Sequence, residues 1–509
     1  MTFAYHGVCD DWWATGTAGQ DDYVKTTFDE SLATVENLQK YKDAGLNVLF
    51  ANYVFGFSST NFENSKLKSV MDMAEEVGLP VIVWDSVLHT LSAKTSSLIV
   101  TDGTADGKNT FASQEALTEY LRGYLASALA HPAFYGVSLK DEPSYTMFTA
   151  MGEVYKALKT IDPTMYVNMN LLPYSPGLID GSADTEYYCS GEDDAYVAGQ
   201  ASSTSAAKEA CYKAYLQAFY EATGAEILQY DDYPIRESGH IYKVENGQFV
   251  LDENGKKIPL ENPVGTPYIL TTHLLNLKIV AEFCRDNGLQ FNRVLQSCAG
   301  STTGLLWKKP TENDFYWQAY LSMAMGVEGY SYWSYYPVIN EGSYEHYDET
   351  ASFVDREGNI NENTYYTLQT LHSIMQKYAK MLSYFEYQNM GVYSQYGAEY
   401  EGSKSFIEMV NSTLVNVAVT LSELSDEADG AALLVSELYD ELHRQYGYWF
   451  VNAEDPVHAD AVEFEVSFGA GYDFIVVYTD GEYQIYELDE EGKAAFTLEC
   501  GRAVFVLPY

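Results

Sequence analysis

The sequence is poor in basic residues, with 29 Lys and Arg against 73 Asp and Glu over 509 residues, a formal net charge of −44. Nucleic acids and anionic membranes are bound through basic patches, so we expect neither as a partner. No apolar run reaches the length of a membrane-spanning helix, so no membrane insertion is expected. The acidic excess is typical of a solvated surface that keeps a protein soluble, and it carries no information about the fold.

Cysteine is scarce, and the six cysteines form no Cys-x-x-Cys pair. The sequence therefore predicts buried free thiols rather than a disulfide framework or a zinc site, and no other metal or cofactor is expected. A secretory leader is missing too, because a strand-like segment begins directly after Met1. Two interpretations stay open: a cytoplasmic protein, or a mature extracellular or cell-surface chain whose leader was replaced by a start Met. The sequence does not indicate an oligomeric state.

Short apolar runs alternate with amphipathic helical stretches over the first three-quarters of the chain, which predicts a parallel sheet with crossover helices. Eight such β/α units are typical of a (β/α)8 TIM barrel. The expected strands are Phe3–Cys9, Asn47–Tyr53, Pro80–Asp85, Tyr135–Lys140, Met165–Leu171, Glu226–Asp231, Gln290–Gln296 and Gly329–Trp333. The expected helices are Glu30–Ala44, Leu67–Val77, Gln114–Ala128, Phe148–Ile161, Ala206–Ala222, Thr272–Asp286, Phe315–Met325 and Tyr366–Tyr384. Gly45, Gly78, Gly224 and Gly288 are expected to stop helices in the left-handed conformation.

The barrel is expected to span residues 1–387, with an insertion at 235–263 after strand 6. Two Asn-Gly dipeptides, Asn246-Gly247 and Asn254-Gly255, predict hairpin turns inside this insertion. From about Gln388 the helical period gives way to strand-like runs, which predict a C-terminal antiparallel β-sandwich at 388–509. That domain is expected to support the barrel, and sugar binding is the alternative.

In a (β/α)8 barrel the active site forms at the carboxyl ends of the strands. Here these ends carry carboxylates, amides and aromatic rings, a combination suited to the hydroxyls and ring faces of a sugar. The candidate binding residues are Asp10, Asp11, Asn52, Asp85, Asn168, Asn170, Tyr230, Tyr233, Gln296 and Trp333. The expected partner is therefore a carbohydrate substrate. A calcium site at Asp10, Asp11 and Asp85 is a second interpretation.

Strand 4 ends in Lys140-Asp141-Glu142-Pro143, the strongest single motif in the chain. A neighbouring carboxylate raises the pKa of a carboxyl group by like-charge repulsion, so Asp141 would keep Glu142 protonated near neutral pH. Glu142 is then a candidate general acid. The alternative is an ordinary ion pair between Lys140 and one of the two carboxylates.

The chain resembles bacterial barrel glycosidases of the β-galactosidase-like, clan-A kind. The resemblance rests on Lys140-Asp-Glu-Pro-Ser144, Tyr230-Asp-Asp-Tyr-Pro234 and Phe353-Val-Asp-Arg-Glu-Gly-Asn359, and in the tail on Leu433-Leu-Val-Ser-Glu-Leu-Tyr439 and Tyr448-Trp-Phe-Val-Asn452. It covers nearly the whole chain and implies a superfamily rather than a substrate. In that clan strand 4 ends in Asn-Glu and strand 7 in a nucleophilic Glu. Here Asp141 replaces the Asn, and strand 7 ends in Gln296-Ser-Cys298.

Without a carboxylate on strand 7, the resemblance leaves two sources for the second catalytic group. One is Asp231 or Asp232 on strand 6. The other is the 2-acetamido group of the substrate, as in family 18 chitinases, which pair a strand-4 Glu with a strand-6 Tyr-Asp and a strand-8 Trp. Tyr230-Asp231 and Trp333 match those positions, and families 20 and 123 carry an adjacent Asp-Glu pair like Asp141-Glu142.

The resemblance thus implies a glycoside hydrolase that cleaves O-glycosidic bonds by general acid catalysis, with retention and with the acetamide route slightly favoured. Asp141 or Asp231 would orient the acetamide in that route. The alternative function is a non-catalytic barrel that binds carbohydrate after losing its strand-7 nucleophile. A lyase or aldolase would need a lysine or a metal cluster at the barrel mouth, and Lys140 alone is a candidate there.

Overall fold

The structure is a computed structural model, and its described residues fall into two compact units. The first contains Met1–Asp232, Asn292–Gly300 and Gly329–Asn361, and the second contains Tyr233–Phe291, Ser301–Glu328 and Glu362–Tyr509. The described residues are 1–5, 7–8, 12–15, 24–27, 32–51, 62–174, 205–236, 244–245, 248–249, 272–302, 305–337, 346–348, 350–394, 414–420, 432–454, 456, 461–468 and 471–509.

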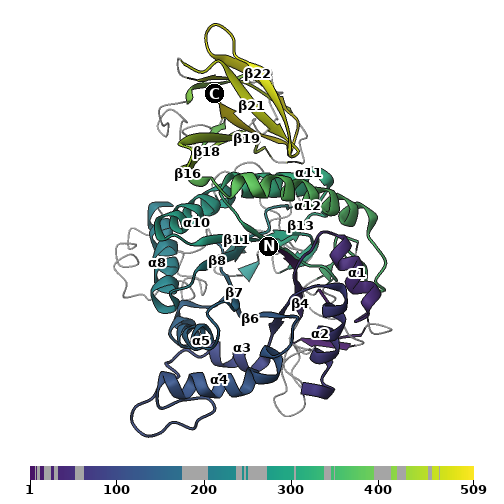
Figure 1. The fold of residues 1–509 in the computed structure, drawn as a ribbon, viewed down its shortest axis with the longest axis vertical. Coiled ribbons are helices and arrows are strands. Elements are labelled where there is room, and N and C mark those ends of the chain that lie inside the picture. Colours follow the sequence, from purple (N-terminus) through teal and green to yellow (C-terminus); the bar gives the residue numbers. More distant parts are fainter. Residues whose placement is uncertain are drawn as a thin grey trace. The chain divides into compact units, whose positions relative to one another are not determined.

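Eight strands form a parallel, nearly closed barrel, as predicted (Figure 1). The strands are β1 (Thr2–Ala4), β4 (Leu49–Ala51), β5 (Val81–Trp84), β6 (Phe134–Asp141), β7 (Tyr166–Leu171), β8 (Ile227–Asp231), β11 (Gln290–Gln296) and β14 (Gly329–Trp333). Their order in space is β1-β14-β11-β8-β7-β6-β5-β4. Asn47 brings the two ends of this order together, because its N–H donates to the Thr2 carbonyl at 2.8 Å and its Oδ1 accepts from the Thr2 N–H at 2.8 Å.

Local capping explains where the helices of the first unit begin. Thr34, Ser65 and Ser113 accept hydrogen bonds from first-turn N–H groups. The helices of this unit are α1 (Val35–Asp43), α2 (Lys66–Val77), α3 (Ser86–Ser92), α4 (Gln114–Leu129), α5 (Phe148–Ile161) and α8 (Ser205–Thr223). The four predicted stop glycines all have positive φ, at 85° for Gly45, 72° for Gly78, 64° for Gly224 and 63° for Gly288. The short helix α3 was not predicted.

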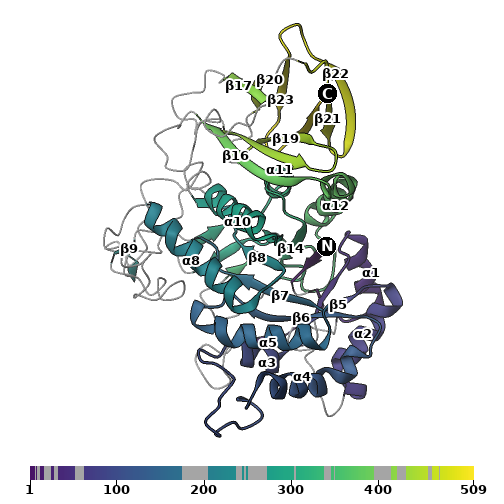
Figure 2. The same cartoon turned by 60° about the vertical axis from the view of Figure 1, so that its left-hand side comes forward.

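Helix α5 packs closely against α8, and Figure 2 shows the two helices side by side. The contact depends on Gly152, which is buried in α5. A Cβ added at this position would lie 2.2 Å from the Ala222 carbonyl oxygen of α8. Backbone atoms cannot rotate away as a side chain can, so the two helices would have to separate.

Gly152→Ala is therefore expected to destabilise the protein, although alanine is the better helix former. Overpacking costs about 1–3 kcal/mol, which exceeds the gain of about 1 kcal/mol in helix propensity. The matched control is Gly123→Ala in α4, where Gly123 is exposed and an added Cβ meets nothing within 4 Å. Melting temperatures should fall for Gly152→Ala and rise slightly for Gly123→Ala. Equal shifts for the two variants would contradict this packing account.

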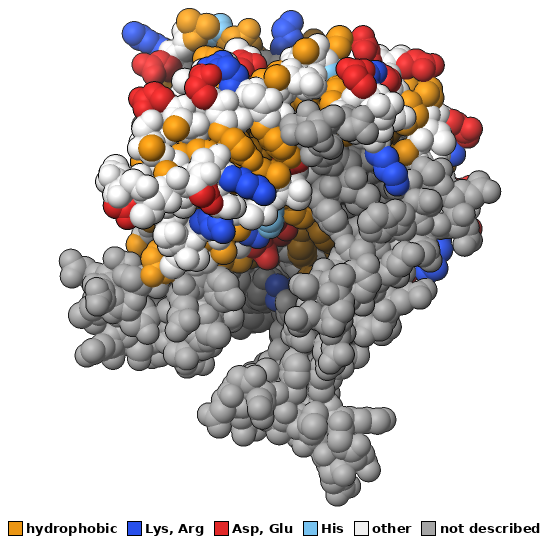
Figure 3. All heavy atoms as spheres, turned by 90° about the horizontal axis from the view of Figure 1, so that it is seen from below, with side chains coloured by type: hydrophobic (Ala, Val, Ile, Leu, Met, Phe, Trp, Pro, Cys, Tyr) orange, Lys and Arg blue, Asp and Glu red, His pale blue; other side chains and the backbone are white. Residues whose placement is uncertain are grey.

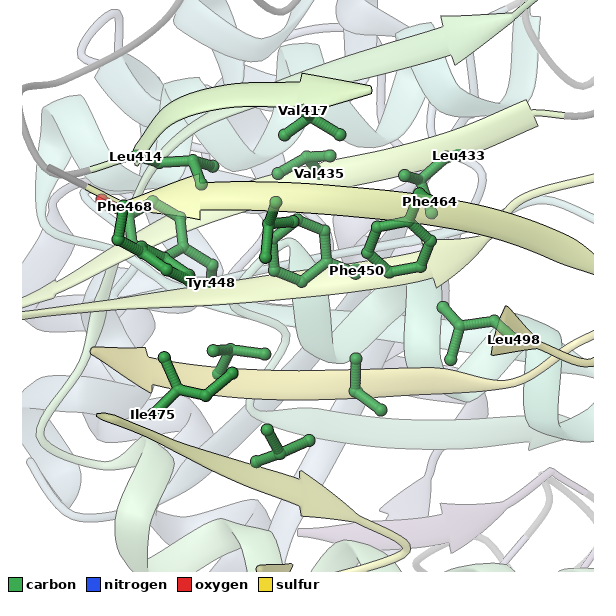
Figure 4. Close-up of a cluster of buried hydrophobic side chains, with 14 of the residues drawn as sticks. Leu414, Val417, Leu433, Val435, Tyr448, Phe450, Phe464, Phe468, Ile475 and Leu498 are labelled. Atoms are coloured by element: carbon green, nitrogen blue, oxygen red, sulfur yellow. The ribbon is translucent and has the colours of Figure 1, made fainter. Parts of the chain in front are cut away.

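The second unit holds the predicted antiparallel sandwich. One sheet has the order β16-β18-β19-β24-β21-β22 and the other β17-β20-β23. The strands are β16 (Glu386–Ser394), β17 (Leu414–Thr420), β18 (Ala432–Asp440), β19 (Gln445–Asn452), β20 (Val462–Phe468), β21 (Phe474–Thr479), β22 (Glu482–Glu487), β23 (Lys493–Leu498) and β24 (Ala503–Pro508). Apolar side chains from both sheets form one core, in which the rings of Phe450 and Phe464 stack 5.2 Å apart (Figure 4).

Three helices, α10 (Leu274–Asn287), α11 (Glu312–Ala324) and α12 (Glu362–Leu382), group with this sandwich. Tyr320 of α11 and Tyr378 of α12 both contact the Trp449 ring, with centroids 5.9 and 5.1 Å away. Arg502 lies 3.8 Å over the Tyr316 ring of α11 and pairs with Glu312 at 3.0 Å. The predicted boundary between the barrel and the β-sandwich, at residues 387 and 388, was placed where helices give way to strands along the sequence. It stays a prediction.

Several smaller predictions can be placed. Strands β9 (Val244–Glu245) and β10 (Gln248–Phe249) pair antiparallel around Asn246-Gly247, as predicted. The Asn254-Gly255 turn lies outside the described residues. Cys211, Cys284, Cys298 and Cys500 are buried free thiols, as expected, whereas Cys9 and Cys189 are not described. No described helix is long and apolar enough to cross a membrane.

Charged side chains of both signs are scattered over the described part of the face shown in Figure 3, interspersed with hydrophobic and polar ones. On that face the acidic excess of the sequence does not form one continuous patch over the described residues. This distribution is that of a solvated surface.

Candidate active site

The strand-4 motif lies at the carboxyl end of β6, where Asn170 of β7 holds it in place. Asp141 is opposite Asn170 in the register, and Asn170 Nδ2 donates to Asp141 Oδ1 at 2.9 Å. The backbone N–H of Glu142 donates to the Asn170 carbonyl oxygen at 2.8 Å. One residue thus holds both the Asp141 side chain and the Glu142 backbone.

Glu142 has φ of 43°, in the left-handed region that a non-glycine residue rarely adopts. The following turn is held by the Tyr215 hydroxyl, which donates to the Pro143 carbonyl at 2.8 Å. Such strained backbone persists where surrounding contacts determine it, and it is concentrated at functional sites. The two carboxyl groups at the end of β6, of Asp141 and of Glu142 directly after it, are therefore positioned by the fold rather than by local preference.

Glu142 is exposed, yet the protein around its carboxyl group disfavours the charged form. Desolvation, followed by the charge of Asp141, raises the pKa of Glu142 to about 7, and the charge of Lys140 opposes this only in part. Burial also raises the pKa of Asp141, whereas the Asn170 hydrogen bond and Lys140 favour its anion. The Asn170 amide donates to Asp141 and stabilises its carboxylate. When the two groups hold one proton between them near neutral pH, that proton is therefore on Glu142.

Tyr5 lies at the centre of the barrel interior and was missed by the sequence analysis. Its hydroxyl accepts hydrogen bonds from Asn168 Nδ2 at 3.2 Å and from Gln229 Nε2 at 2.9 Å. Burial, Asp141 and Asp231 raise the pKa of Tyr5 well above its ordinary value. Both carboxylates therefore lie close enough to act on one hydroxyl, Asp141 from β6 and Asp231 from β8.

The reason for this miss is the length of the first strand. Phe3–Cys9 was predicted, which made Asp10 and Asp11 the strand-end residues, but β1 ends at Ala4 and Tyr5 follows it directly. The sequence signal that could have identified Tyr5 is a tyrosine placed directly after a short apolar run. Asp10, Asp11 and Asn52 lie outside the described residues.

Below the two carboxylates the barrel interior carries a chain of directed hydrogen bonds. Asn292 Nδ2 donates to the Tyr166 hydroxyl at 3.3 Å, and that hydroxyl donates to Asn168 Oδ1 at 3.4 Å. The Asn168 amide then donates to both Tyr5 and Ser138 Oγ, each at 3.2 Å. Asn168 is therefore part of the scaffold that holds Tyr5.

The other predicted strand-end residues are placed as follows. Asp231 and Asp232 are buried at the end of β8, and Tyr230 is fully buried. Gln296 donates to the Cys298 carbonyl at 3.1 Å, and burial followed by Asp231 raises the pKa of the Cys298 thiol. The Trp333 ring is partly exposed, 5.7 Å from the Tyr5 ring. Tyr233 belongs to the second unit and contacts Trp307.

Asp85 has a structural role in this arrangement. Its Oδ1 accepts from the N–H groups of Val87 and Leu88 at 2.8 and 3.0 Å, which caps α3, and its Oδ2 accepts from the Tyr124 hydroxyl at 2.9 Å. The residue is 0% exposed. Sugar binding by Asp85 stays a prediction.

Lys140 is half-buried beside the two carboxylates. Burial lowers the pKa of Lys140, and the charges of Asp141 and Glu142 oppose this only in part. Nearby, Trp84 Nε1 donates to His89 Nδ1 at 3.2 Å, and burial with the Lys140 charge lowers the pKa of His89 to about 4. His89 is thus neutral at pH 7. Among the described residues, no three His, Cys, Asp or Glu side chains are grouped as metal ligands would be.

No protein-family model matches this sequence, and neither does any curated protein. Among solved structures, one described as a glycoside hydrolase is similar over 99% of this chain and 98% of its own, at 9% identity and a TM-score of 0.42. A family 5 glycoside hydrolase from Bacteroides vulgatus is similar over 93% and 84%, at 9% identity and a TM-score of 0.43. A family 44 endoglucanase from Clostridium thermocellum is similar over 100% and 93%, at 9% identity and a TM-score of 0.36.

Proposed function

We propose that this protein is a glycoside hydrolase in which Glu142 is the general acid. The supporting observation is the pair at the end of β6, in which Asn170 favours the Asp141 anion and the pKa of Glu142 is raised to about 7. A general acid works best when its pKa lies near the working pH, because it then keeps its proton and still releases it readily. Glu142 is exposed, so a substrate can reach its carboxyl group.

In the proposed first step, the Glu142 proton is transferred to the glycosidic oxygen as the bond between that oxygen and C1 breaks. The acetamide oxygen of a 2-acetamido sugar attacks C1 from the other face and forms an oxazolinium ion. The Asp141 carboxylate accepts the acetamide N–H and stabilises the positive charge. Water then attacks C1 as the bond between C1 and the acetamide oxygen breaks, which restores the 2-acetamido group. The Glu142 carboxylate takes the proton from the water, and the product has retained configuration.

The end of strand 7 supports this route over a protein nucleophile. Gln296, Ser297 and Cys298 provide no carboxylate there. Among the described residues, Asp231 and Asp232 at the end of β8 are the carboxylates considered for a protein nucleophile. Asp141 is only partly buried and lies next to the acid. Trp333 would provide the face on which the sugar ring rests.

The test is hydrolysis of paired aryl glycosides that differ only in a 2-acetamido or a 2-hydroxy group. We expect the 2-acetamido substrates to be cleaved with retention, as read by proton NMR, and a thiazoline analogue of the oxazolinium ion to inhibit. Cleavage without thiazoline inhibition would transfer the second role to Asp231 or Asp232. If the protein binds glycans but cleaves none, it is a carbohydrate-binding barrel and the proposed function is wrong.

A further inference from the structure

Two side-chain carbonyl oxygens in the barrel interior have no hydrogen-bond partner among the described residues: Asn170 Oδ1 and Gln229 Oε1. Both residues are only 2% exposed. A buried acceptor without a donor costs about 1–3 kcal/mol, so such groups in a native protein call for a specific explanation.

The two acceptors belong to residues that are direct neighbours across two strands. Asn170 of β7 is opposite Gln229 of β8 in the register. Side chains that leave neighbouring strands at the same register position lie within reach of one small ligand. One ligand with two adjacent donors would therefore satisfy both oxygens at once.

The hydrogen bonds of each amide nitrogen fix which way its oxygen points. Asn170 Nδ2 donates to Asp141 Oδ1, and a carboxylate can only accept, so the Asn170 oxygen points away from Asp141. Gln229 Nε2 donates to the Tyr5 hydroxyl at 2.9 Å, which leaves the Gln229 oxygen on the other side of its amide. Both oxygens are thus held by the fold before any ligand arrives.

We infer that Asn170 and Gln229 determine specificity by accepting hydrogen bonds from two hydroxyl groups on neighbouring carbons of the sugar. This inference rests on the proposed function, because the position of the acid, Glu142, sets the orientation of the sugar ring. Glu142 and Asp141 on β6 act at C1 and at the C2 substituent, and the next two strands are β7 and β8. The ring carbons C3 and C4 follow C2 in the order in which β7 and β8 follow β6. Asn170 therefore accepts a hydrogen bond from the C3 hydroxyl, and Gln229 accepts one from the C4 hydroxyl. The substrate class is a sugar with both hydroxyls free.

The experiment compares an aryl glycoside that the wild type cleaves with its 3-deoxy, 4-deoxy and 6-deoxy analogues. We expect kcat/KM to fall about tenfold or more for the 3-deoxy and 4-deoxy substrates, and little for the 6-deoxy substrate. In Gln229→Met, which keeps the side-chain length without the amide, the parent and the 4-deoxy substrate should be cleaved at similar rates. Gln217→Met, the same substitution at an exposed glutamine of α8, should keep the wild-type ratio.

The inference is overturned if the wild type cleaves the 3-deoxy and 4-deoxy substrates as fast as the parent, or if Gln229→Met discriminates against the 4-deoxy substrate as strongly as the wild type does. Should Gln229→Met fail to fold, the wild-type series alone decides between these outcomes. Calorimetric binding of the free parent and deoxy sugars separates this inference from the proposed function. A loss of affinity for the 3-deoxy and 4-deoxy sugars would support the inference even in a protein that cleaves nothing.

Discussion

Glu142→Gln is expected to lower kcat by about 10³-fold on glycosides with poor leaving groups. The substitution keeps the size and polarity of the side chain but removes the proton that the leaving oxygen needs. Because Glu142 also takes the proton from water in the second step, an intermediate should accumulate when the leaving group is good. Steady-state hydrolysis of alkyl and aryl glycosides measures the first effect, and pre-steady-state bursts measure the second.

The matched control is Glu119→Gln, which changes an exposed glutamate on α4 whose partner is Arg122 at 3.2 Å. It should keep wild-type kcat and KM. Full activity of Glu142→Gln, with a correctly folded protein, would show that the acid has been assigned to the wrong residue.

Asp141→Asn is expected to change both the rate and its pH dependence. Loss of the carboxylate removes the charge that stabilises the cationic intermediate, and such losses cost about 10²–10³-fold in kcat. It also removes one of the two causes that raise the pKa of Glu142 to about 7. Only protonated Glu142 is active, so wild-type kcat/KM should fall as the pH rises through about 7. In Asp141→Asn the fall should begin at a lower pH.

A profile of kcat/KM against pH for both proteins measures this shift, because its limbs report the ionisations of the free enzyme. Asp43→Asn removes an exposed carboxylate on α1 and should leave the profile unchanged. An alkaline limb that stays in place, or that moves upward, in Asp141→Asn would contradict the proposed coupling between the two carboxyl groups.

The barrel could be predicted because its signal is local. The strands contain short apolar runs, and several helices begin or end at a recognisable cap, such as Ser65 before α2 and Gly78 after it. The position of the candidate acid could be predicted for the same reason, since Asp141 and Glu142 are adjacent in the chain and lie at a strand end.

The contacts that hold the candidate site could not be predicted, because they depend on distances between strands, and one sequence does not contain these distances. Asn170 holds Asp141 only because β6 and β7 pair in one register, with an irregularity between Ser138 and Lys140. Tyr5 was hidden because β1 ends one residue after Phe3, in an apolar stretch that continues beyond it. Asp85 could not be predicted as a helix cap, because α3 has only 7 residues and gives too short a periodic pattern to mark the aspartate before it as an N-cap.

The measurement that tests the central claim most directly is the dependence of log kcat/KM on the leaving-group pKa, for wild type and Glu142→Gln. If Glu142 protonates the leaving oxygen, the wild-type plot should be shallow, because the acid compensates for a poor leaving group. The Glu142→Gln plot should be steep, with activity approaching that of the wild type only for the best leaving groups. Parallel plots for the two proteins would show that Glu142 is not the proton donor.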